Sequence, residues 1–179
     1  MSTSVFDTAP GFDQPIAVLK HCHDRIRRNL ATLGLLPAHL AAHGADDEAR
    51  RAADGILRYF TQAAPLHHAD EEDNLLPMLQ DVATGADALA LQEILPQIMA
   101  EHVRMEAAWS ALEPGLRAVS SGEAASLTGD AGAFAALYAA HMELEESVVA
   151  PMAKRLFDGE AMARLGAAMR ARRGIAPQE

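Results

Sequence analysis

Apolar residues recur every three or four positions along four long stretches of the chain, and none alternates between apolar and polar residues as a strand would. This periodicity predicts helices that each turn one apolar stripe toward a shared core. The breaks between the stretches are short, which favours antiparallel neighbours. The pattern predicts an all-α fold: an up-down-up-down four-helix bundle over about residues 13–157, with a short C-terminal helix over about 159–172. We expect residues 1–179 to form a single domain.

Capping residues, glycines and prolines set the expected ends of the first two helices. Asp13 is the predicted N-cap of the first helix, which Pro37 should kink or end and Gly44 should close. The second helix should run from residue 46 or 47 to about 81. Pro65 should bend it in the middle, and its apolar stripe should end at Met78.

The second helical pair follows a short break at residues 84–85. Pro114, followed by a glycine, should end or bend the third helix, and the Ser-, Gly- and Thr-rich stretch 120–130 is typical of a loop. The fourth helix should start at Asp130 and end at Asp158. Its expected stripe includes Tyr138 and Val148.

Composition narrows the class of protein. Half of the residues are hydrophobic, only 4% are aromatic, the formal net charge is −10 and the pI is about 5.2. An acidic protein is a poor binder of nucleic acid and of anionic membranes. No apolar run approaches the roughly 18 residues of a membrane span, and no secretory signal is visible. One cysteine excludes an intramolecular disulfide. These features indicate a cytoplasmic protein. We expect it to be a monomer or a homodimer.

Each predicted stripe carries a histidine where an apolar residue is expected: His23, His67, His102 and His141. Three of them are followed four residues later by a glutamate: Glu71, Glu106 and Glu145. Residues four apart stand one turn apart on the same helix face. These pairs therefore point an imidazole and a carboxylate toward the bundle axis.

A lone histidine on an apolar face is usually a hydrogen-bonded core residue, but four on four stripes would leave several ionisable groups buried together. Unpaired buried charges are costly, and metal coordination is the simplest compensation. Bundles that bind two iron or manganese ions place carboxylates and histidines in this manner. Nitrogen and oxygen donors without cysteine suit iron or manganese better than structural zinc.

Some candidates are weaker than others. Glu106 competes with Met105 for the inward direction. His68 lies beside His67 but off the stripe, so we favour His67. Tyr138 either hydrogen-bonds near the site or packs in the core. We interpret four further carboxylates as solvated or supporting side chains: Glu72, Asp73, Glu143 and Glu146.

Four segments together resemble the haemerythrin-like (HHE cation-binding) family over about residues 14–156: HDRI at 23–26, HHADEE at 67–72 through Leu76-Pro77, Glu101-His102, and His141 through Glu145-Glu146 to Pro151. The second and fourth are specific, and the first and third are weak alone. The resemblance implies a non-haem centre of two iron ions. It implies as ligands His23, His67, Glu71, His102, His141 and Glu145. Glu71 and Glu145 would bridge the irons.

The sequence departs from the oxygen-carrying members of that family. Those have HxxxH on the third helix, where this chain has His102 and Glu106. They have HxxxxD on the fourth, where this chain has Glu145 at the fourth position and Glu146 at the fifth. A carboxylate in place of a histidine favours the ferric state, which moves the expectation from oxygen carriage toward oxidase, peroxidase or iron-sensing behaviour.

Three hypotheses follow. The first is a protein that binds or senses oxygen, nitric oxide or iron. The second is an enzyme, a di-iron oxidase, peroxidase or ferroxidase that uses peroxide or Fe(II). The third is a structural module in which the histidines only satisfy one another, and we rank it last.

Overall fold

A computed structural model describes residues 9–123, 127 and 129–176. Over these residues the chain is helical and contains no strand. The elements in order are α1 Pro15–His43, α2 Asp47–Arg58, η1 Tyr59–Ala63, α3 Ala64–Asp70, η2 Glu71–Leu75, α4 Leu76–Val82, α5 Gly85–Ser121, α6 Ala131–Leu144, η3 Glu145–Val149, α7 Ala150–Leu156 and α8 Gly159–Arg172, where η marks a π-helical segment.

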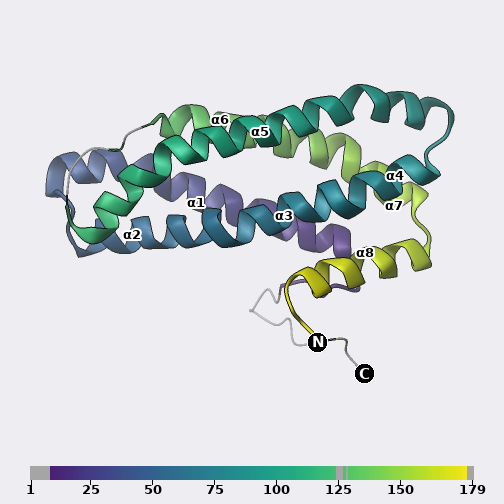
Figure 1. The fold of residues 1–179 in the computed structure, drawn as a ribbon, viewed down its shortest axis with the longest axis horizontal. Coiled ribbons are helices and arrows are strands. Elements are labelled where there is room, and N and C mark those ends of the chain that lie inside the picture. Colours follow the sequence, from purple (N-terminus) through teal and green to yellow (C-terminus); the bar gives the residue numbers. More distant parts are fainter. Residues whose placement is uncertain (1–8, 124–126, 128, 177–179) are drawn as a thin grey trace, which may run out of the picture.

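These elements form four long rods and one short helix (Figure 1). The first rod is α1, the second runs from α2 to α4, the third is α5, and the fourth runs from α6 to α7. Each rod packs against its two neighbours in a ring, and the fourth returns to the first. The predicted four-helix bundle with a short C-terminal helix is confirmed. No described helix has the length and apolar character needed to cross a membrane.

The helix ends agree with the predictions in part. The N-cap of α1 is Gln14 rather than Asp13, and α1 continues through Pro37. Gly44, with φ of 69°, ends α1 as expected. Asp46 caps α2 by accepting hydrogen bonds from two backbone N–H groups of the first turn.

The third rod is longer than predicted. Pro114 lies inside α5, which continues until Gly122 adopts φ of 79°. Four residues of the predicted loop, 124–126 and 128, lie outside the described residues. Asp130 caps α6 with its side chain at the predicted start of the fourth helix. Asp158, which was predicted only to end that helix, caps α8 with its side chain.

Three π-helical segments interrupt the second and fourth rods, each just before a proline: Pro65, Pro77 and Pro151. Proline has no N–H, and its ring clashes with the carbonyl four residues earlier. A turn with one extra residue accommodates that clash without breaking the rod. In the last two segments, the backbone carbonyls of Glu71 and Glu145 accept the hydrogen bond that closes the widened turn.

The extra residue shifts the inward-facing positions beyond it by one. On the fourth rod we predicted Val148 in the core, and the structure buries Val149 instead. On the second rod Leu79 is fully buried, while Met78, the residue predicted from an unbroken helix, is only partly so. A period of 3.6 residues cannot anticipate this shift.

The buried apolar residues form two clusters, one toward each end of the bundle. One contains Phe60, Met105 and Phe134, and the other contains Leu19, Leu79 and Ile98. Between them lies a layer of buried ionisable side chains: His23, His67, Asp70, Glu71, Glu101, His102, His141 and Glu145. Among the described residues no other polar or charged side chain is buried to this degree.

Helix α8 lies along one side of the bundle, against α1 and α3 (Figure 1). It is held through Asp70, whose carboxylate is completely buried. Arg172 and Arg173 each reach one oxygen of Asp70 at 2.6 Å. Arg172 also contacts Asp73 and Asn74, both at 2.9 Å. The C-terminal helix is thus fixed to the segment that carries His67, His68 and Glu71.

We expect Asp70→Ala to lower the free energy of unfolding by about 2 to 4 kcal/mol, because it breaks a buried ion-pair cluster. The matched control is Asp87→Ala, which removes a carboxylate with a similar two-pronged contact to Arg155 at the surface. Exposed pairs of this kind contribute little. Urea denaturation of both variants measures the difference, and equal losses would contradict the role given to Asp70.

Candidate metal centre

The buried ionisable layer brings together six of the seven side chains predicted as ligands. Two groups of four have ligand atoms that all lie within 4.8 Å of one another. The first group is His23, His67, Glu71 and Glu145, and the second is Glu71, His102, His141 and Glu145. Glu71 and Glu145 belong to both. The arrangement therefore offers two adjacent cation positions that share two carboxylates.

At the first position, imidazoles from α1 and α3 face the shared carboxylates. Nε2 of His23 lies 3.0 Å from Oε2 of Glu145, and Nε2 of His67 lies 3.1 Å from Oε1 of Glu71. Neither contact has the geometry of a hydrogen bond, since both nitrogens remain without a hydrogen-bond partner. The donor atoms converge on a point between them rather than on each other.

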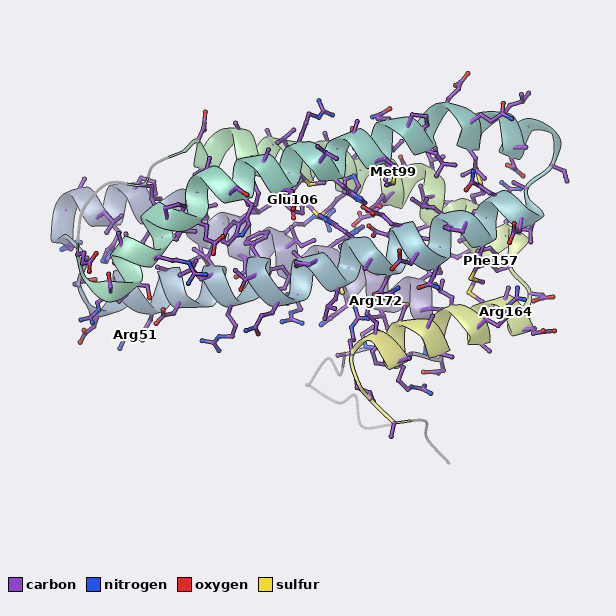
Figure 2. All side chains as sticks on the ribbon, viewed as in Figure 1. Arg51, Met99, Glu106, Phe157, Arg164 and Arg172 are labelled. Atoms are coloured by element: carbon purple, nitrogen blue, oxygen red, sulfur yellow. The ribbon has the colours of Figure 1, made fainter. Side chains whose placement is uncertain are left out.

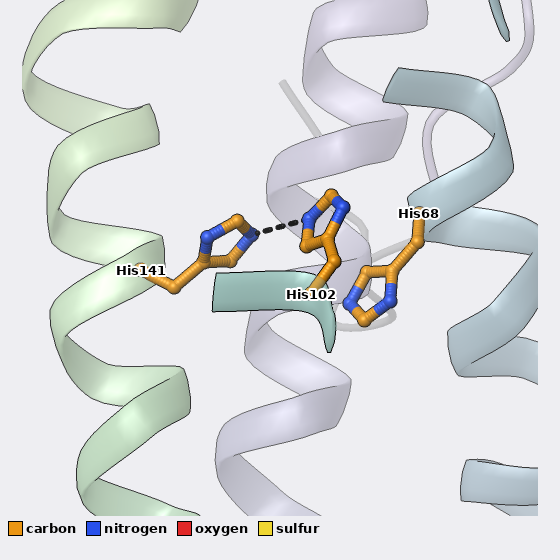
Figure 3. A group of neighbouring side chains, drawn as sticks. All are labelled: His68, His102 and His141. Carbon is orange, nitrogen blue, oxygen red and sulfur yellow. Dashed lines mark hydrogen bonds between the residues drawn. The ribbon is translucent and has the colours of Figure 1, made fainter. Parts of the chain in front are cut away.

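At the second position, imidazoles from α5 and α6 approach the same carboxylates from the other side. Nε2 of His102 lies 3.5 Å from Oε2 of Glu71, and Nε2 of His141 lies 3.3 Å from Oε1 of Glu145. The two Nε2 atoms are 3.1 Å apart. His68 joins these two histidines in a third group (Figure 3).

The placement of His68 corrects the sequence analysis, which set it aside as lying off the stripe. Its ring stacks on that of His102, with centroids 4.1 Å apart. The second rod packs against both the first and the third. Two consecutive residues about 100° apart on a helix can therefore both face inward, His67 toward α1 and His68 toward α5.

Glu106 is not part of either group. Glu106 lies on α5 (Figure 2). Its side chain is exposed, whereas Met105 is buried in the core. Met105 rather than Glu106 points into the core, because burying an apolar side chain is favourable and burying a carboxylate is not. The second position receives an imidazole from His68 instead of a carboxylate from Glu106.

Three further carboxylates lie behind the histidines. Nδ1 of His23 contacts Glu146 at 2.9 Å. Nδ1 of His141 contacts Glu101 at 3.1 Å, and Nδ1 of His102 contacts Glu72. In each case Nε2 is left to face the centre.

Such carboxylate partners fix the tautomer and the orientation of metal-binding histidines. Two of them, Glu72 and Glu146, were predicted only as solvated or supporting side chains. Glu101 entered the sequence analysis only as the neighbour of His102. It is 5% exposed and faces α6, and Gln97 holds its other oxygen at 2.8 Å. The sequence feature that could have identified Glu101 is its position one residue before His102.

The unsatisfied buried polar atoms all belong to this cluster. Among the described residues, buried side-chain nitrogen and oxygen atoms without a hydrogen-bond partner occur on five residues only: His23, His67, His68, Glu71 and Glu145. Buried polar groups in folded proteins are almost always paired. Their concentration at one point therefore indicates a site that a cation completes.

Burial dominates the titration of the central groups. It holds the pKa of His67 well below its ordinary value and lowers the pKa of His68 to about 2. It also lowers the pKa of His102, and it raises the pKa of Glu71 well above the ordinary value, with Glu145 adding to the rise. Burial therefore favours the neutral forms of these three imidazoles and of the Glu71 carboxyl group.

His23 titrates differently. Burial lowers its pKa, but the contacts with Glu145 and Glu146 outweigh burial and raise it. Glu146 is itself held in place by Arg27 at 2.8 Å.

Two cavities reach the cluster from opposite sides of the bundle. One, of about 580 Å³, lies between the second rod and α5 and extends to His68, His102 and Tyr138. The other, of about 280 Å³, lies between α1 and the fourth rod and extends to His23, Glu71 and Glu145. Each candidate cation position therefore has its own approach.

A sequence model of the Hemerythrin HHE cation binding domain matches residues 14–153. The chain belongs to this family. It is also similar to an uncharacterized protein of Haemophilus influenzae, with 29% identity over 165 residues that cover 92% of each chain. The residues matched by the hemerythrin HHE family begin at the N-cap of α1 and end inside α7, and α8 lies beyond them.

This HHE chain also contains a short internal repeat that the sequence-based predictions did not use. The pattern H-x3-E-E-x4-P occurs twice, from His67 to Pro77 and from His141 to Pro151. In both copies the first glutamate begins a π-helical segment and the proline follows it. The equal spacing of histidine, paired glutamates and proline was visible in the sequence.

Metal binding can test whether His68, rather than Glu106, belongs to the candidate metal centre. We expect His68→Ala to weaken binding of the second metal ion by at least about tenfold, because it removes a donor or an imidazole packed on one. Glu106→Ala is the matched control and should bind metal as the unchanged chain does. Competition with a chromophoric chelator measures both affinities, and the reverse ranking would contradict the assignment.

Proposed function

We propose that this protein is a non-haem di-iron protein that binds or senses a small ligand, oxygen or nitric oxide, or reports iron. The observation that carries the proposal is the pair of four-donor groups sharing Glu71 and Glu145. Membership of a cation-binding family supports it. When bound, two irons would supply ligand binding and electron exchange.

The donor set fits such a centre. His23 and His67 would hold the first ion, and His68, His102 and His141 the second, with Glu71 and Glu145 shared. Imidazole and carboxylate without thiolate suits iron or manganese. The carboxylates behind His23, His102 and His141 hold each ring with Nε2 inward.

Small-ligand binding is favoured over oxidation chemistry by the place of His68. The departure from oxygen-carrying relatives rested on a carboxylate, Glu106, in place of a histidine. With Glu106 exposed and His68 in the cluster, the candidate set contains five imidazoles and two carboxylates. Without Glu106 among the candidate ligands, we no longer expect a carboxylate-rich site that favours ferric iron.

The enzyme hypothesis keeps one supporting observation. The 580 Å³ cavity is larger than a diatomic ligand needs, and Tyr138, 3% exposed, lines it next to His68. Turnover of peroxide or oxidation of Fe(II) by the iron-loaded protein, lost in Tyr138→Phe, would favour a di-iron oxidase, peroxidase or ferroxidase. A ligand-dependent spectrum without turnover favours binding or sensing. A cytoplasmic location and a monomeric or homodimeric state remain predictions.

The decisive measurement is iron content together with thermal stability. We expect about two irons per chain, and stabilisation of about 2.7 kcal/mol when free iron exceeds the dissociation constant a hundredfold. Glu145→Ala should lose most of the iron, because this residue serves both positions, whereas Glu106→Ala should retain it. One zinc per chain, or a melting temperature that iron does not change, would contradict the di-iron proposal and favour a structural role for the histidines.

Metal affinity should rise with pH. Burial raises the pKa of Glu71, so a cation must displace a proton from this carboxylate. As pH falls, protons compete with the metal at Glu71 and at His23, whose pKa is also raised. Dissociation constants measured by chelator competition at several pH values test this. An affinity unchanged across the acidic to neutral range would contradict it.

A further inference from the structure

The chain contains only two lysines among 179 residues, Lys20 and Lys154. Both line the 280 Å³ cavity between α1 and the fourth rod, which we call the lysine groove. Among the described residues, neither ammonium group has a carboxylate within ion-pair distance, and both side chains are exposed. Two unpaired cations beside the proposed metal centre need an explanation in a chain of net charge −10.

The two lysines lie at different heights along the groove. Lys20 precedes His23 by three residues on α1, which is about 4.5 Å along the helix axis. Lys154 follows Glu145 by nine residues, which is roughly 13 Å along the fourth rod. Between them the walls are apolar and include Ile16, Leu75, Val149 and Pro151.

The cavity on the opposite side has the opposite character. Its lining contains Glu72, Asp73, Glu106 and Glu113 and no lysine or arginine. An anion approaching there meets repulsion, whereas the lysine groove attracts it. The carboxylate at the side of the lysine groove, Glu146, is already paired with Arg27 and His23.

We propose that the lysine groove binds a small aliphatic monocarboxylate, with its carboxylate beside Lys20 and the first metal position and its chain along the apolar walls toward Lys154. The inference rests on the proposed function, because two metal ions would offset Glu71 and Glu145 at the floor of the groove. The first position also has fewer protein donors than the second.

The volume and lining of the groove define the ligand class. A space of about 280 Å³ is below that of most pockets for drug-sized ligands, which limits the chain to a few carbons. The lining contains no arginine, the residue whose geometry best matches phosphate. One ammonium group beside the centre, Lys20, and apolar walls that lead away from it fit a single carboxylate with an aliphatic tail. The ammonium group of Lys154 is exposed to solvent, so it adds to the attraction of an anion without needing a second carboxylate.

The test is calorimetric titration of the iron-loaded protein with hexanoate, after its iron content has been measured. Hexanoate should bind, and 1-hexanol, which lacks the charge, should bind at least about tenfold more weakly. Binding should weaken as salt is added. The double variant Lys20→Gln/Lys154→Gln should bind hexanoate about three- to tenfold more weakly and with less dependence on salt.

The matched control removes the same charge elsewhere. Arg51 and Arg164, labelled in Figure 2, are exposed, do not line the groove, and carry no ion pair among the described residues. Arg51→Gln/Arg164→Gln should bind hexanoate as the unchanged chain does. Equal weakening in both double variants would show only an effect of overall charge and would overturn the proposal.

Two filling variants locate the ligand. Ala17→Phe adds a ring inside the lysine groove, and Ser110→Phe adds one in the opposite cavity. Hexanoate binding should be lost in the first variant and kept in the second, and the reverse result would overturn the proposal.

Because the chain has only two lysines, acetylation followed by mass spectrometry gives a second readout. Hexanoate should slow acetylation of Lys20 in the loaded protein. Protein that holds two irons per chain but shows neither binding nor protection overturns the lysine-groove ligand alone. Protein that holds no iron overturns the proposed function, and the lysine-groove inference with it.

Discussion

The structure depends on the burial of ionisable side chains in one layer across all four rods. A carboxylate or imidazole in an apolar core is costly unless its charge is met by a partner. Here the outer nitrogens of three histidines have carboxylate partners, while inner atoms of His23, His67, Glu71 and Glu145 have no hydrogen-bond partner among the described residues. The outer polar atoms of the layer therefore have partners and several of the central ones do not. A pair of cations bound at the centre would supply the missing partners.

Prolines determine how the two shared carboxylates are presented. Glu71 and Glu145 each open a widened turn that ends just before a proline. The same local solution appears on two rods that do not adjoin each other in the sequence. A substitution that restored a regular helix in either place would rotate the following turns by one residue and would shift Leu79 or Val149 out of the core.

Much of this could be predicted from the sequence, for reasons that also explain the errors. Stripes of apolar residues located four rods, and histidines on those stripes located the layer, because burial enforces the periodicity. Met78 and Val148 were misplaced because the period changes at a widened turn. His68 was set aside because a single stripe per helix was assumed, whereas a rod in a ring of four has two inward-facing neighbours. Glu106 followed the spacing of the other pairs, but Met105 competes better for the core.

The polar layer also divides the bundle into two apolar clusters, one toward each end. Cooperative unfolding needs contacts that couple all parts, and a layer of unpaired donors couples its two sides poorly. Without cations, backbone amides at the two ends would exchange their hydrogens with solvent as separate units. Metal ions that join all four rods at the middle would couple the two ends into one cooperative unit. The hydrogen-exchange rates of backbone amides at the two ends would then show whether the centre holds metal.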